Sequence, residues 1–143
     1  MEKIHGTKLL EIAVATLICG LVIATSVVWF LDLRKGSRDT QRMADIKQIQ
    51  KDLLNYFSEH REYPETKDLY TVAQGLPLDP GGERYGYENI NKETYVLGTC
   101  LESPRTADVQ SYSRADAENY EMRGAGTKCT CASINAYCVN PDL

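Results

Sequence analysis

The sequence is short of the residues from which active sites and basic binding faces are built. Of its two histidines, His5 lies near the N-terminus and His60 in a charged stretch, and neither has a nucleophile close in sequence. There is no glycine-rich phosphate loop, and no carboxylate pair stands out from the acidic background. The 16 Lys and Arg residues are outnumbered by 20 Asp and Glu residues, which argues against a nucleic-acid-binding protein with a basic face. We therefore expect that the protein is not an enzyme, that it has no cofactor or metal site, and that it does not bind nucleic acid directly.

Proline is equally scarce, and none precedes Pro64. Nothing therefore interrupts a helix over residues 7–62, which would be about 84 Å long. Gly20 and Gly36 are the points at which bending or partial melting of this helix is expected.

Apolar residues are concentrated near the N-terminus, where they make up 16 of the 20 residues from Ile12 to Leu31. The stretch 9–31 carries one charge, Glu11, and as a helix would span about 34 Å, against a bilayer core of about 30 Å. A cleaved signal peptide, with a cut near Ser26, is the alternative, but its apolar region should be only about 7–15 residues long. The pattern favours a retained transmembrane helix over 9–31.

The residues before this run, MEKIHG-TKLLE, resemble the class III leader of type IV pilins and type II secretion pseudopilins. In that family a prepilin peptidase cuts after a glycine, and a glutamate stands fifth in the mature chain. The resemblance implies a leader over 1–6, a cut between Gly6 and Thr7, methylation of the Thr7 amine and an assembly role for Glu11. Thr7 stands where the family usually has Phe.

The resemblance implies a structural subunit of a pilus-like or pseudopilus filament, whose partners are other pilin-like subunits, the peptidase, an inner-membrane assembly platform and, before assembly, membrane lipid. Because a buried unpaired carboxylate is costly, Glu11 of one subunit is expected to pair with the Thr7 amine of its neighbour. The alternative is a membrane-anchored extracytoplasmic binding domain that does not polymerise. The sequence does not distinguish secretion from adhesion, motility or DNA uptake.

From Asp39 onward apolar residues recur at helical spacing, with charged residues between them. These apolar residues are Met43, Ile46, Ile49, Leu53, Leu54 and Phe57. Pro64 ends the pattern. The pattern alone also fits a separate soluble helix, but a charged helix ending at Tyr63-Pro64 adds to the family resemblance. We therefore expect one helical stalk over 7–62.

The remaining residues, 63–143, form an acidic head with a net charge of −5. A turn-rich stretch over 75–82 precedes Tyr85 and Tyr87, a loop over 89–92 and an alternating run over 94–101, which together predict an antiparallel hairpin. This region also resembles the Pro-x-Asp-Pro turn and Tyr-x-Tyr strand of the major pseudopilin. So small a head needs the helix face to complete its core, giving an α+β fold with a long helix on a small antiparallel sheet. Residues 103–128 fit either a short helix or an ordered loop.

Cys19 lies in the apolar run as a small filler, whereas the head holds the other four cysteines: Cys100, Cys129, Cys131 and Cys138. Four cysteines in a small extracytoplasmic domain predict two disulfides. A Cys129–Cys131 bridge would be strained, so Cys100 is expected to pair with one of these two and Cys138 with the other. A zinc site, for which C-x-C is the wrong spacing, and free thiols are the alternatives.

The flanking charges conflict with the cysteines over orientation. Lys3 and Lys8 precede the apolar run, and it is followed by Arg34, Lys35, Arg38 and Arg42. Counting positive charges would place the C-terminal side in the cytoplasm. The predicted disulfides and the family resemblance place the head outside. We favour a single-pass inner-membrane protein with an extracytoplasmic head, which later joins a periplasmic or extracellular filament.

Overall fold

The computed structural model describes residues 3–72, 75–104 and 120–141. Within them lie two helices, α1 (Lys3–His60) and α2 (Leu69–Val72), and five strands: β1 (Gly86–Asn91), β2 (Thr94–Cys100), β3 (Glu121–Gly124), β4 (Thr127–Thr130) and β5 (Ala136–Val139). The chain divides into two compact units, Met1–Lys35 and Gly36–Leu143. The expected α+β class, a long helix with a small antiparallel sheet, is confirmed.

Helix α1 is unbroken through Gly20 and Gly36, so the expected partial melting at the glycines does not occur. It ends at His60, ahead of Pro64. Arg61 has a φ of 62°, the left-handed conformation that caps helix C-termini, and its amide donates to the Phe57 carbonyl at 2.8 Å. The left-handed residue, rather than the proline, terminates the helix.

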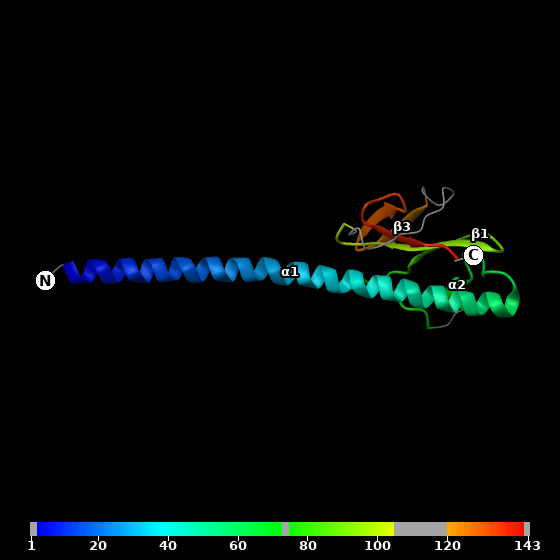
Figure 1. The fold of residues 1–143 in the computed structure, drawn as a ribbon, viewed down its shortest axis with the longest axis horizontal. Helices are drawn as coiled ribbons and strands as arrows, with labels where there is room; N and C mark the ends of the chain where they lie inside the picture. Colours follow the sequence, from blue (N-terminus) through cyan, green and yellow to red (C-terminus); the bar gives the residue numbers. More distant parts are fainter. Residues whose placement is uncertain (1–2, 73–74, 105–119, 142–143) are drawn as a thin grey trace. The chain divides into compact units, whose positions relative to one another are not determined.

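The second unit is built on a three-stranded antiparallel sheet in the order β1–β2–β5, beside which the last turns of α1 run (Figure 1). Tyr87 pairs with Leu97 across β1 and β2, and Leu97 pairs with Val139 across β2 and β5. The predicted hairpin is therefore present. Its loop is tighter than the expected 89–92, because β1 continues to Asn91 after a register irregularity.

Strand β2 is buried at every position, although simple alternation predicts one buried face. Tyr95 and Leu97 belong to a core cluster that includes Ile46, Ile49 and Leu53 of α1. Val96 and Cys100 belong to a second cluster around Met122 of β3. The side chains on one face of the sheet therefore pack against α1. Those on the other face pack against the hairpin β3–β4.

The stretch 103–128 was expected to be a short helix or an ordered loop, but its end contains β3 and the start of β4. Residues 105–119 of this stretch lie outside the described residues. β3 and β4 pair antiparallel with Met122 opposite Cys129. The approach to β2 is so close that a Cβ on Gly98 would lie 2.6 Å from the Met122 Sδ. Glycine is required there because a larger residue would separate the two layers.

The buried stripe of α1 differs from the predicted apolar face at one position. Ile46, Ile49 and Leu53 are at most 2% exposed, as expected. Leu54 is 59% exposed, because successive helical residues point about 100° apart and Leu53 already faces the sheet. Leu54 was predicted to lie on the apolar face, but it belongs to the solvent-facing surface of the second unit.

Candidate functional site

The first unit presents a bare apolar helix surface. All described side chains from Lys8 to Lys35 are exposed, and they include the predicted transmembrane segment 9–31. This part of α1 is long and apolar enough to cross a membrane. A helix that is apolar all round is stable only where lipid or other protein surrounds it.

Gly6, Thr7 and Glu11 occupy the first turns of α1. Thr7 and Glu11 are four residues apart, so they lie on one face of the helix. The Glu11 side chain is exposed, and no ion pair to it is found among the described residues. The predicted assembly carboxylate therefore stands on the apolar surface without a cation from its own described chain.

The head cysteines form two disulfides, Cys100–Cys129 and Cys131–Cys138. The prediction of two bridges is confirmed, and the pairing is one of the two that avoid a Cys129–Cys131 bond. The first bridge ties β2 to β4, and the second ties the turn after β4 to β5. Within the described ranges no group of three or more metal-binding side chains occurs, and Cys19 is the free, exposed cysteine.

A buried arginine lies where α1 meets the head. The Arg42 side chain is 2% exposed, and its Nε donates to Asp79 Oδ1 at 2.6 Å. Its Nη1 donates to Asp39 at 2.8 Å and to Glu102 at 3.0 Å. One guanidinium therefore joins the helix to the turn before β1 and to the segment after β2.

Two further contacts complete this cluster. Arg38 donates to both carboxylate oxygens of Glu102, at 2.6 and 2.5 Å. Asp39 accepts the backbone N–H groups of Glu102 and Ser103 at 2.9 and 3.0 Å. We call Arg38, Asp39, Arg42, Asp79 and Glu102 the arginine cluster; it fixes the position of α1 along the sheet.

Hydrogen bonding favours the charged forms of Glu102 and Arg42. The bond from Arg38, together with that from Arg42, lowers the pKa of Glu102 to about 2 although burial opposes this. Burial would lower the pKa of Arg42, but its bonds to Asp79, Glu102 and Asp39 raise it above its usual value. Charge-assisted bonds of this kind are about twice as strong as neutral ones.

The arginine cluster was missed because only apolar residues were counted along the helix. Residues 39, 42, 46, 49 and 53 follow the alternating spacing of three and four that marks one helix face. Asp39 and Arg42 are therefore in phase with the apolar stripe. A charged pair in phase with such a stripe was the available signal.

Tyr85, just before β1, and Tyr87, within it, bind α1 and the segment that follows α1. Tyr85 donates its hydroxyl to Asp45 of α1 at 2.7 Å, and Tyr87 donates to the Pro64 carbonyl at 2.7 Å. Burial raises the pKa of both hydroxyls, and for Tyr85 the carboxylate of Asp45 raises it further. Each tyrosine therefore remains a neutral hydrogen-bond donor.

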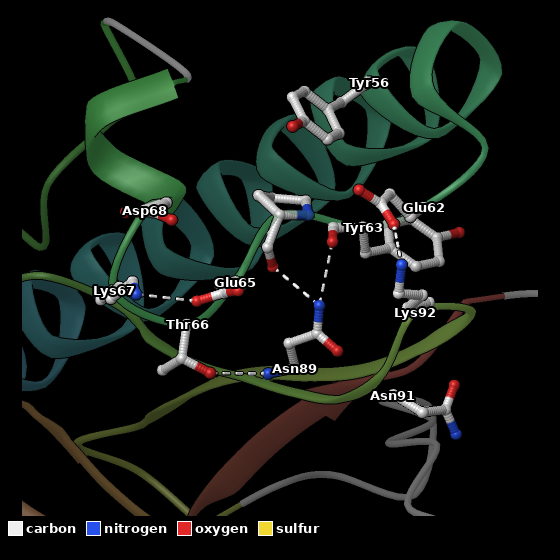
Figure 2. A pocket seen from close by; sticks show the side chains of 11 residues that line it. Tyr56, Glu62, Tyr63, Glu65, Thr66, Lys67, Asp68, Asn89, Asn91 and Lys92 are labelled. Carbon is white, nitrogen blue, oxygen red and sulfur yellow. Dashed lines mark hydrogen bonds and ion pairs between the residues drawn. The ribbon is translucent and has the colours of Figure 1, made fainter.

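A polar cleft of about 620 Å³ lies where the end of α1 and the following segment meet β1, as Figure 2 shows. Asn89 spans it, donating to the carbonyls of Tyr63 and Pro64 at 3.0 and 2.9 Å. Lys92 pairs with Glu62 at 2.8 Å on one side. The groups in this cleft bind mainly one another, so the cleft connects the helix end to the sheet.

Comparison with protein-family models, with curated proteins and with solved structures found no match for this chain.

Proposed function

We propose that this chain is a structural subunit of a type IV pilus-like or type II secretion pseudopilus filament, anchored in the inner membrane before assembly. The observation that carries the proposal is the exposed Glu11, which has no ion pair among the described residues and lies on an apolar helix of membrane length, five residues after Gly6. Cleavage after Gly6 would free an ammonium on Thr7. A carboxylate in an apolar environment is stabilised strongly by such a cation, which favours one axial register between neighbouring subunits.

The proposed extracytoplasmic head is supported by its two disulfides, since disulfides persist in oxidising compartments. Two of the four positive charges that argued for a cytoplasmic head, Arg38 and Arg42, have another explanation. Arg38 and Arg42 bind carboxylates of the head. These arginines are needed for the fold, whichever side of the membrane it occupies.

The proposal is tested first by the mass of the mature chain. Coexpression with a prepilin peptidase should give a protein that begins at Thr7 and carries a methylated amine. A chain that keeps its first six residues, or that begins near Ser26, would instead support an anchored or secreted head that never polymerises.

Assembly is tested by Glu11→Ala in a host that carries the filament machinery. We expect the variant to remain in the membrane fraction and to be absent from sheared filaments, because the pairing carboxylate is gone. Glu59→Ala is the matched control, since Glu59 is an exposed acid on the same helix outside the apolar segment. Normal incorporation of the Glu11 variant would refute the assembly role.

A further inference from the structure

Aromatic side chains gather at the C-terminal end of the apolar surface. Trp29 is 76% exposed, more than any other large apolar side chain among the described residues, and Phe30 beside it is 54% exposed. Trp29 is also the single tryptophan of the sequence. Tryptophan rings at the end of a membrane helix occupy the headgroup region, where one edge is apolar and the other is wet.

The cation that follows these rings has no carboxylate partner among the described residues. The Arg34 guanidinium carbon lies 4.3 Å from the centre of the Phe30 ring, a cation–π arrangement. By contrast, Asp32 pairs with Lys35 at 3.8 Å, and Arg38 pairs with Glu102. Arg34 is therefore oriented by an aromatic face and free to bind an anion from outside the chain.

A shallow groove of about 360 Å³ runs from beside Arg34 toward the middle of the apolar segment. It is lined by Thr25, Ser26, Trp29, Phe30 and Leu33. The hydroxyls of Thr25 and Ser26 donate to the Val22 carbonyl, at 3.0 and 2.7 Å. Because these polar groups are satisfied inside the helix, the groove offers a hydrocarbon surface to its occupant.

We propose that this end of the helix binds an anionic phospholipid, with its phosphate on Arg34 and an acyl chain in the groove. The arrangement fits the direction of a lipid, because the cation lies at the end of the apolar segment and the groove extends about 12 Å back along the helix axis toward its centre. The inference rests only on the membrane-anchored part of the proposed function, and polymerisation is not needed.

Charge complementarity favours lipid over a second copy of this chain. A parallel copy at the same depth would bring Asp32 near Arg34, but that carboxylate is already paired with Lys35. An anionic headgroup supplies the missing charge directly. Each cation near an anionic surface favours it by about fivefold in association constant at moderate salt.

The test uses the full-length protein in vesicles that mix phosphatidylcholine with phosphatidylglycerol, with bromine on the acyl chains of one lipid or the other. Bromine quenches tryptophan fluorescence at short range, and Trp29 is the sole tryptophan. We expect brominated phosphatidylglycerol to quench with a relative association constant about fivefold above that of phosphatidylcholine. Arg34→Gln should reduce this preference to parity.

Arg84→Gln is the matched control, since the Arg84 guanidinium carbon lies 4.8 Å from the Tyr70 ring centre in the second unit. It should leave the preference unchanged. Equal quenching by both lipids in the unaltered protein would overturn the proposal, as would quenching that falls as the protein-to-lipid ratio rises, which would place a second copy in the groove.

Two outcomes separate this proposal from the proposed function. Trp29 emission typical of water in every vesicle would overturn both the lipid site and the membrane anchor. The expected phosphatidylglycerol preference, found together with a chain that is not cut before Thr7, would retain the lipid site and refute the pilin-like processing.

Discussion

Arg42 is the side chain on which the joining of helix and head depends most directly. It is almost fully buried and binds Asp39, Asp79 and Glu102. Its net stabilisation over an apolar residue in a repacked site is small, because desolvation offsets the attraction between the charges. Removing it alone is different, since three carboxylates would then lose their shared cation.

Arg42→Met should therefore lower the free energy of unfolding of the head by about 3–5 kcal/mol. Urea denaturation monitored by circular dichroism measures this. Lys47→Met is the control, because Lys47 is an exposed cation on the same helix, and its loss should change the free energy by less than about 0.5 kcal/mol. Equal effects of the two variants would contradict the role of Arg42 in joining α1 to the rest of the second unit.

Because of Glu102, the free energy of unfolding of the head should depend on pH in the acidic range. Its pKa is lowered in the folded chain from 4.5 to about 2, chiefly by the hydrogen bond from Arg38. The stabilisation is therefore complete above pH 4.5 and is lost as the pH falls toward 2. It amounts to up to about 3 kcal/mol.

Denaturation curves at several pH values between 5 and 2 should show Glu102→Gln to be less stable than the unaltered protein at pH 5, with the gap closing by pH 2. Glu83→Gln, which changes an exposed acid, should stay parallel to the unaltered protein. A gap that is constant with pH would show that Glu102 stabilises the head without its charge.

Among single residues, the sequence allowed predictions only where the signal is a short spacing or a count along the chain. Glu11 was found by its distance from Gly6, and the cysteines by their number and the strain of a one-residue separation. Arg42 was not, because two of its three carboxylate partners, Asp79 and Glu102, come 37 and 60 residues later in the chain. Only the fold brings those groups together.

Among the elements, the hairpin β3–β4 depends most on covalent links. Cys100–Cys129 spans 29 residues and Cys131–Cys138 spans 7. In the chain-entropy model, closing loops of these lengths stabilises the folded state by about 3.6 and about 2.4 kcal/mol. The longer loop is the one that attaches the hairpin to β2.

Replacing Cys100 and Cys129 together by alanine should therefore cost about 1 kcal/mol more than replacing Cys131 and Cys138. Thermal unfolding of the two double variants, compared with the unaltered protein, measures the difference. The two variants serve as controls for each other, since each leaves one bridge intact. A larger cost for the shorter loop would show that packing around Met122, rather than chain entropy, determines the loss.

The sequence predicted the hairpin β1–β2 but not β3–β4, for a physical reason. Residues 94–101 fit an alternating sequence pattern, although every residue of β2 is buried, and asparagines at 89 and 91 indicate a turn before the strand. The second hairpin has strands of only four residues and turns through Ala125 and Gly126, whose φ angles are 53° and 71°. Turns with two successive positive φ angles usually have the sequence Asn-Gly. Because alanine stands at the first position here, the sequence does not indicate the turn.

On the scale of the whole molecule, the division into units falls between Lys35 and Gly36. The step in hydropathy predicted an apolar end at 31, close to this division. The sequence assigned the amphipathic part of α1 to a stalk over 7–62 and predicted that its face completes the core of the head over 63–143. Ile46, Ile49 and Leu53 are core residues of the same unit as the sheet.

A chain beginning at Gly36 should therefore fold by itself as a water-soluble protein with both disulfides, because no described residue before Gly36 belongs to its core clusters. Its unfolding midpoint should match that of the head in the detergent-solubilised full chain to within about 4 °C, the shift that roughly 1 kcal/mol produces. A chain beginning at Tyr63 is the comparison, and it should fail to fold.

Many head contacts of α1 join residues that are far apart in the chain. Glu102 follows Asp39 by 63 residues, and the Asn140 carbonyl accepts a bond from Gln50, 90 residues earlier. Such high contact order delays folding, since the stripe is synthesised long before the strands that cover it. Asp39 and Arg42 limit its uninterrupted apolar part to the turns from Ile46 onward. Before the strands of a nascent chain are complete, these two charges make its exposed stripe a poorer surface for binding another unfinished chain.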